Sequence, residues 1–248
     1  MNNDNYWASR RTIRKFTPQP VSDEVTDSML KLAAQAPTTG NMQLYSVVVS
    51  KSPEILAALR PAHFNQPASQ APVLLTFCAD INRFTRWCDI SGADAGFDNF
   101  QSFMAALLDV TIFAQQFTTI AEQQGLGVCY LGTTTYNAPD IALTLKLPKG
   151  VIPVITLALG FPDETGAVSD RLPLDAIRHR EVYHDPSADE ILFHYAPKEA
   201  LPENQRFIAE NNKHTLAQVF TDVRYPRANN EHFSQVLLDF LRSNGLIP

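Results

Sequence analysis

The sequence predicts an α+β fold, with a central and mostly antiparallel sheet flanked by helices. Runs of β-branched and aromatic residues alternate with helical periodicities, but irregularly, so a regular βαβ array is not favoured. The chain has 248 residues, of which 45% are hydrophobic, and this suffices for one large domain with a real core. We expect a single domain, with a core over about 1–180 and a helical C-terminal extension over about 181–248.

The first element is a basic segment, Arg-Arg-Thr-Ile-Arg-Lys-Phe, at positions 10–16. As an extended strand it would place Arg10, Thr12 and Arg14 on one face. Two guanidinium forks and a hydroxyl donor suit a phosphate, which accepts bidentate bonds from arginine. The plain alternative is a solvated basic strand, and only the rest of the chain favours the phosphate.

A helix follows, with Ser22 as its N-cap and with Asp23 and Glu24 in the first turn, near the positive end of the helix dipole. Pro37 stops this helix. Positions 37–43, Pro-Thr-Thr-Gly-Asn-Met-Gln, then form a loop of small polar residues. Such loops are usually turns, although their many short donors can also wrap a polar planar ligand.

Short apolar runs predict four buried strands, at 45–50, 72–78, 128–132 and 151–159. Ser52 and Pro53 begin a short helix after the first strand. Gln70 lies just before the second strand, a position typical of the mouth of a binding site. The stretch 83–96 is expected to be irregular.

The longest helix is expected at 99–124, where apolar residues occupy more than one face. This pattern indicates either a large core or a subunit interface, and the two are about equally favoured. Gly125 ends the helix. Further helices are expected at 137–145, at 206–220 and from near Asn230 onward.

Composition excludes several classes of partner. The net charge of −6 and the pI of about 5.5 argue against nucleic acid or an anionic membrane surface. The longest apolar run, 151–161, is too short to span a bilayer, and the polar positions 1–5 lack a signal-peptide core. The three cysteines form no paired spacing, so we expect no metal and a cytoplasmic location. The chain has no G-x-G-x-x-G and no P-loop.

Together these pieces resemble the flavin-dependent nitroreductases, and within them the larger NADPH-type nitroreductase and flavin reductase branch. No single segment is specific, but their order and spacing are. The segments are 10–16; 36–43; Gly-Leu-Gly-Val-Cys-Tyr-Leu-Gly at 125–132; and 147–173, with Leu-Pro, Leu-Gly-Phe-Pro and Arg-Leu-Pro.

The resemblance implies a nitroreductase-like fold and a homodimer that binds FMN at the subunit interface. Arg10 and Thr12 would bind the FMN phosphate, Arg171 would close on it, and Arg11 belongs to the same cofactor-binding set. Arg14 would lie near the pyrimidine end of the isoalloxazine and stabilise the negative charge of the reduced flavin.

The rest of the implied flavin site comes from three other places. The partner subunit would supply loop 37–43, Gln70 would meet the pyrimidine edge, and 130–133 would approach the ring near N5 and the dimethylbenzene side. The residues concerned are Pro37, Thr38, Thr39, Asn41, Gln43, Gln70, Tyr130, Leu131, Gly132 and Thr133.

The implied activity is that of an FMN-dependent NAD(P)H oxidoreductase, in which a hydride passes from NADPH or NADH to flavin N5 and then to an acceptor. Nitroaromatics, quinones or free flavin are the implied small-molecule electron acceptors. The flavin performs the chemistry, so no side chain need act as a nucleophile or as an obligate base. One alternative is a flavin-binding or sensing protein of the same fold without turnover. Another is a generic α+β domain with a basic N-terminal strand.

Two details of the chain bear on this activity. Where the branch often has Lys-Pro-Arg, this chain has Ser169, Asp170 and Arg171, so one cation of the implied phosphate clamp is missing. We expect NADPH to be preferred over NADH, because a 2′-phosphate needs one or two cations and the C-terminal region supplies several. These are Arg206, Lys213, Arg224 and Arg227.

Overall fold

The structure is a computed structural model that describes residues 3–248; Met1 and Asn2, part of the polar N-terminus, lie outside the described residues. The chain divides into two compact units. The residues up to Ala167 together with Phe233–Pro248 form one, here called the sheet unit. Val168–His232 forms the other, here called the helical unit.

The sheet unit is built on four antiparallel strands in the order β1-β2-β4-β3. They confirm the predicted strands, whose ends differ from the observed ones only slightly. Every residue of β2 is buried, as is typical of a central strand covered on both faces. The bounds are β1 Tyr45–Ser50, β2 Val73–Asp80, β3 Gly127–Leu131 and β4 Val151–Gly160.

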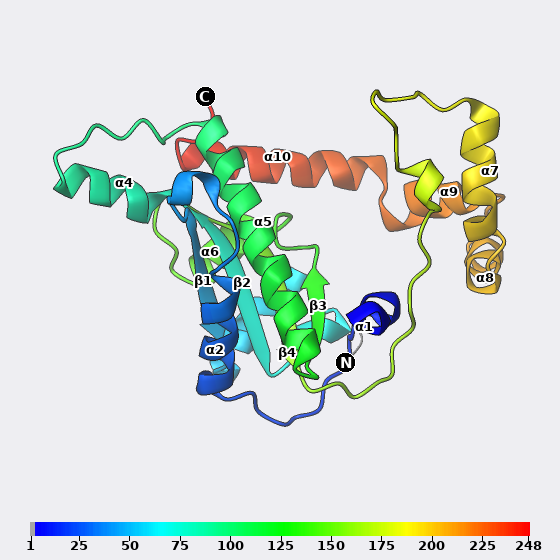
Figure 1. Ribbon diagram of the computed structural model, residues 1–248, viewed down its shortest axis with the longest axis horizontal. Helices are drawn as coiled ribbons and strands as arrows, with labels where there is room; N and C mark the ends of the chain where they lie inside the picture. Colours follow the sequence, from blue (N-terminus) through cyan, green and yellow to red (C-terminus); the bar gives the residue numbers. More distant parts are fainter. Residues whose placement is uncertain (1–2) are drawn as a thin grey trace. The chain divides into compact units, whose positions relative to one another are not determined.

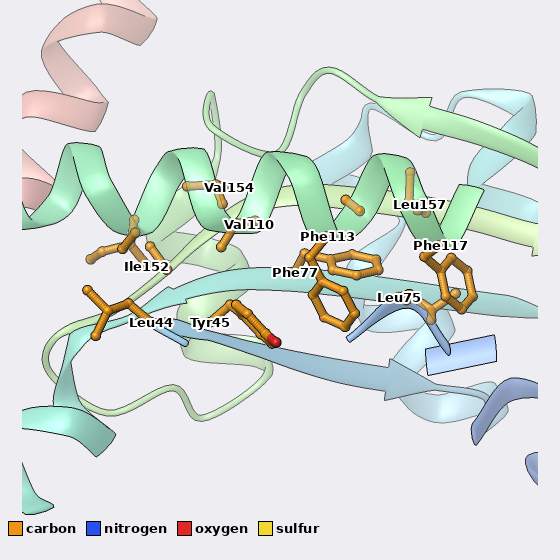
Figure 2. Packing of buried hydrophobic residues seen from close by; sticks show 14 of the residues in the cluster. Leu44, Tyr45, Leu75, Phe77, Val110, Phe113, Phe117, Ile152, Val154 and Leu157 are labelled. Carbon is orange, nitrogen blue, oxygen red and sulfur yellow. The ribbon is translucent and has the colours of Figure 1, made fainter. Parts of the chain in front are cut away.

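The longest helix, α5 (Phe100–Gln123), lies across one face of this sheet beside α2 (Asp23–Ala33) (Figure 1). Figure 2 shows Phe113 and Phe117 of α5 pointing toward Phe77 of β2. The ring centroids of Phe77 and Phe113 are 5.3 Å apart at an interplanar angle of 75°, an edge-to-face arrangement that aromatic pairs favour. The predicted N-cap of α2, Ser22, is confirmed, and the structure adds Asn99 as the N-cap of α5.

A second cluster covers the opposite face of the sheet. Leu74 of β2 and Leu131 of β3 contribute to it, whereas Val73 and Leu75 face α5, as the two-residue period of a strand requires. The elements involved are α3 (Pro53–Leu59), α6 (Ala138–Thr144) and the short 3₁₀ turns η2 (Pro61–His63) and η3 (Pro67–Gln70). The sheet is therefore enclosed between two helical layers.

The remaining elements are short or peripheral. In the sheet unit they are α1 (Asn3–Ser9), η1 (Thr39–Asn41) and α4 (Ile81–Ile90). The helical unit contains η4 (Leu174–Ala176), α7 (Ala188–Glu199), α8 (Pro202–Glu210), α9 (Leu216–Gln218) and the π-helical turn η5 (Val219–Arg224). The last helix, α10 (Arg227–Ser243), begins in the helical unit and from Phe233 onward belongs to the sheet unit.

The prediction that residues 10–16 form a strand is wrong. Phe16 makes an isolated bridge, to Pro162, and the segment lies outside the four-stranded sheet. The reason is a contact with a distant part of the chain, since the backbone N–H groups of Arg14 and Lys15 donate to the carboxylate of Glu164 rather than to a neighbouring strand.

Two other local predictions are also corrected. The stretch expected to be irregular contains most of α4, whose first turn is capped by the Asp80 side chain accepting from the backbone N–H of Arg83. The helix expected at 206–220 is interrupted after Glu210, where Asn212 takes a left-handed conformation with φ of 52°.

Among the described residues, α5 is long and apolar enough by composition to cross a membrane. Its apolar side chains, however, pack into a globular core: Phe103, Val110, Phe113 and Phe117 are all buried. Core helices of this kind pass the same test of length and composition, so α5 is better explained as the central core helix.

Candidate functional site

The basic N-terminal segment is fixed to the edge of the sheet at β3. The backbone N–H of Ile13 donates to the carbonyl oxygen of Val128, at 3.2 Å. Gly127 permits this approach, because a Cβ at that position would lie 2.8 Å from the Ile13 side chain. The segment therefore has a defined place against β3 although it is not a strand.

A hollow of about 320 Å³ opens beside this segment. Arg10 and Arg11 line it together with the hydroxyl-bearing residues Tyr6, Ser9 and Thr165. Glu122 and Glu164 bring two carboxylates to the same hollow, and the other lining residues are Ile13, Gly125, Leu126 and Pro162. Two guanidinium groups with nearby hydroxyls form a donor set that fits a phosphate.

Arg10 is not a free cation in this hollow. Its Nε lies 3.2 Å from Oε1 of Glu122, in the last turn of α5. The phenol of Tyr6, in α1, donates to Oε2 of the same carboxylate at 2.7 Å. Burial, reinforced by this hydrogen bond, raises the pKa of Tyr6 to about 12.

Glu164 occupies the neighbouring backbone donors. Its carboxylate accepts hydrogen bonds from the N–H groups of Arg14 and Lys15, the latter at 3.1 Å. The bond from Arg14 is the main reason that the pKa of Glu164 is lowered. The side chains of Arg11 and Arg14 remain exposed, while Thr12 is partly buried.

Loop 37–43 is anchored nearer the N-terminal end of α5 than the basic segment is. The backbone N–H and the hydroxyl of Thr39 both donate to Oδ1 of Asp109, at 2.8 and 3.0 Å, and Asp109 is only 1% exposed. Asp109 and Glu122 are thirteen residues apart on one helix, which corresponds to about 20 Å. Within one chain, therefore, the structure does not bring loop 37–43 onto the basic segment.

The other predicted loop residues take conformations that small polar residues tolerate. Gly40, Asn41 and Gln43 have positive φ angles of 58°, 56° and 55°. The side chain of Arg83 holds the loop by donating to the carbonyl oxygens of Gln43 and Tyr45, at 2.7 and 2.9 Å. Pro37, Thr39 and Asn41 are exposed and Thr38 is partly buried.

The stretch 130–133 turns its large side chains inward. The phenol of Tyr130 donates to Gln115 of α5 at 3.2 Å, and Leu131 is buried in the second cluster. Thr133 bonds to Nδ1 of His63 at 2.9 Å and accepts from the amide of Gln66 at 3.2 Å. Gly132 faces open space, since a Cβ added at this position would meet no described atom within 4 Å.

Sequence reasoning missed three residues that organise this region: His63, Asp109 and Glu122. His63 is fully buried, and burial lowers its pKa to about 4, so the imidazole is neutral near pH 7. The available signal was a polar residue interrupting an apolar helical face, as at Asp109. That signal does not indicate which distant residue is the partner.

The nitroreductase family model matches residues 7–161. The chain belongs to the nitroreductase family. The resemblance inferred from segments 10–16, 36–43, 125–132 and 147–173 is thus confirmed, as is the predicted α+β class.

Relatives within the family extend over most of the chain. An FMN reductase (NADPH) of Bacillus subtilis is 31% identical over 71% of this chain and 72% of its own length. An FMN reductase [NAD(P)H] of the same organism is 30% identical over 87% of this chain and 90% of its own. A solved structure from Bacteroides fragilis NCTC 9343 has a TM-score of 0.96 and 48% identity, covering 98% of this chain and 100% of that one.

Two more predicted site residues, Gln70 and Arg171, belong to different units. Gln70 is exposed at the end of η3, just before β2, as expected. Arg171 belongs to the helical unit, where its guanidinium donates to the carbonyl oxygens of Ser169 and Asp170 at 3.3 and 2.8 Å. Lys198 pairs with Asp170 at 2.7 Å and so supplies a cation beside the position where the sequence lacks one. The contact of Arg171 with a phosphate stays a prediction.

The four cations considered for the nucleotide 2′-phosphate all have partners within the helical unit. Lys213 pairs with Asp222 at 2.8 Å. Arg224 lies over the ring of Phe207, 4.7 Å from its centroid. Arg206 pairs with Glu210 at 3.5 Å and Arg227 with Glu231 at 3.7 Å. A nucleotide phosphate would compete with these partners, so the predicted role of these cations remains a prediction.

Proposed function

We propose that this protein is an FMN-dependent NAD(P)H oxidoreductase of the nitroreductase and flavin or quinone reductase type. Family membership supports the class, and the relatives named as FMN reductases support the cofactor and the nicotinamide donor. Bound FMN supplies the hydride-transfer chemistry between NADPH or NADH and a small-molecule electron acceptor. The protein's own task is to bind and orient the cofactor and to exclude competing reactions.

The observation that carries the proposal is the hollow beside the basic segment. Its two arginines match the charge of a phosphate, and Thr165 adds a hydroxyl donor. We assign Arg10, Arg11 and Thr12 to the phosphate of FMN and Arg14 to the pyrimidine end of the ring.

Where the proposed site faces the flavin ring, it is formed by backbone groups as much as by side chains. Tyr130 and Leu131 direct their side chains into the protein, and Gly132 leaves space for a planar group to approach. Gln70 and Thr133 are the polar groups assigned to the ring edges. The division of the chain into a flavin-binding core over about 1–180 and a helical extension remains part of this proposal.

We infer that the working form is a homodimer in which loop 37–43 of one protomer completes the site of the other. The separation of about 20 Å between Asp109 and Glu122 along α5 supports this arrangement. The outward face of α5 supports it too, because Leu108 is 57% exposed and Ile112 is 41% exposed on a helix whose other face is core. Sedimentation at micromolar concentration tests it, and an FMN-loaded monomer would contradict it.

The decisive experiment titrates FMN into the purified cofactor-free protein and then adds NADPH without oxygen. We expect tight binding and bleaching of the yellow oxidised flavin. Arg10→Ala should weaken FMN binding at least about tenfold, because charge-assisted hydrogen bonds contribute roughly 1.5–3 kcal/mol each. Arg206→Ala, in the helical unit, is the matched control and should leave FMN binding unchanged.

The other outcomes separate the alternatives. Binding without bleaching by NADPH or NADH would favour a flavin-binding protein without turnover. A protein that takes up no FMN would refute the proposal altogether. A steady-state screen of nitroaromatic, quinone and flavin acceptors then defines the acceptor class.

A further inference from the structure

Three elements meet at the carboxylate of Glu122. Glu122 lies in the last turn of α5, Tyr6 in α1, and Arg10 in the basic segment that follows α1. The Glu122 side chain is only 9% exposed. One oxygen accepts from the phenol of Tyr6, and the other faces Nε of Arg10.

The placement of this carboxylate is energetically unfavourable unless it is paired. A negative charge at the C-terminal end of a helix opposes the helix dipole, and a buried carboxylate loses its hydration. Both costs are offset here by one cation and one strong donor. A glutamine or an apolar residue would avoid both costs, so the charge itself calls for an explanation.

The geometry of arginine supplies that explanation. The guanidinium group is planar and has five N–H donors in a fixed fork. The ion pair with Glu122, at 3.2 Å, holds this group beside the hollow, where its N–H donors can meet a phosphate in bidentate fashion. Tyr6 keeps its proton over the whole physiological pH range, because its pKa is raised to about 12. The support for Glu122 therefore does not change with pH near neutrality.

We propose that Glu122, held in turn by Tyr6, is a positioning residue that orients Arg10 toward the phosphate of FMN and so determines how strongly the site prefers FMN to riboflavin. This inference rests on the proposed function. It predicts that Glu122 strengthens phosphate binding, whereas simple charge repulsion predicts that Glu122 weakens it. A carboxylate that only sits near a phosphate repels it, whereas one that orients the phosphate-binding arginine strengthens binding.

The test measures the dissociation constants of FMN and of riboflavin for the cofactor-free full-length protein, by quenching of flavin fluorescence. Their ratio isolates the contribution of the phosphate, because the two ligands share the same ring. Glu122→Gln should lower the FMN preference at least about fivefold with little change in riboflavin binding. Tyr6→Phe, which removes one hydroxyl, should lower it about two- to threefold.

Two further variants make the test specific. In an Arg10→Ala background, Glu122→Gln should have no additional effect on the ratio, because Glu122 acts through Arg10. Glu210→Gln makes the same chemical change at a carboxylate paired with Arg206 in the helical unit, and it should leave the ratio at the wild-type value. If Glu122→Gln does not fold, Tyr6→Phe in both backgrounds gives the same comparison.

The failures are distinguishable. A wild-type protein that binds neither flavin overturns both the proposed function and this inference. A wild-type protein that prefers FMN, together with an unchanged or increased preference in Glu122→Gln, overturns this inference alone. An equal loss of FMN and riboflavin binding shows a purely structural role for Glu122 and also overturns it.

Discussion

The sheet unit and the helical unit differ in how their residues are held. In the sheet unit, all eight residues of β2 and ten residues of α5 are buried. In the helical unit, all of which the structure describes, only Asn204, Ile208, Leu216 and Val219 are buried. The apolar residues of α7 are largely outside any core: Leu192 is 67% exposed and Phe193 is 76% exposed. The sheet unit therefore carries most of the hydrophobic stabilisation, and the helical unit relies more on ion pairs and ring contacts.

The largest expected effect comes from removing a ring in the sheet unit. Phe117→Ala should lower the free energy of unfolding by about 3–5 kcal/mol, because it leaves a cavity between α5 and β2. Leu216→Ala, in the small cluster of the helical unit, should cost about 2 kcal/mol, at the low end for such changes, because the surroundings can collapse. Urea unfolding followed by circular dichroism measures both. Equal losses would contradict the difference between the units.

The comparison extends to pH, because the buried His63 should make the stability of the sheet unit sensitive to acid. Burial lowers its folded-state pKa to about 4, against about 6.5 in an unfolded chain. The unfolded state therefore takes up a proton first, so the stabilisation is complete above about pH 6.5 and is lost as the pH falls toward 4. The loss is about 3 kcal/mol, since one pKa unit corresponds to about 1.4 kcal/mol.

Urea unfolding at several pH values between 4 and 7, chosen to span the two pKa values, checks this expectation. His63→Asn should flatten this part of the pH dependence, whatever its effect on stability at neutral pH. The same change at His214, an exposed residue of the helical unit, is the control and should preserve the wild-type slope. A slope unaffected by His63→Asn would show that other groups cause the acid sensitivity.

The smallest expected effect is at an ion pair of the helical unit. Lys198 and Asp170 are 2.7 Å apart, and each side chain is 28% exposed, so solvent screens much of their attraction. Lys198→Met should change the free energy of unfolding by less than about 1 kcal/mol, and the change should diminish as salt is added. Thermal melts at low and high ionic strength measure it. A loss as large as that from Leu216→Ala would mean that ion pairs, rather than the small core, hold this unit together.

Local chemistry made much of the fold predictable. The cap Ser22, the stop at Gly125 and the alternating strand residues act within a few positions of themselves, so sequence patterns contain them. Predictions failed where a side chain overrode the local pattern. Glu164 takes backbone donors from the basic segment, and Asp80 caps a helix where loop residues were expected.

The candidate site shows the same difference between local patterns and long-range contacts. The sequence by itself determined the residue types for the phosphate, the order of the segments and, through them, the family. Only the tertiary structure decided what those residues touch: Arg10 with Glu122, Thr39 with Asp109, and Thr133 with His63. The members of each pair are separated by 70 residues or more. Local propensity acts over a turn of helix or a pair of strand residues, whereas these contacts form only when the packed sheet and α5 bring distant side chains together.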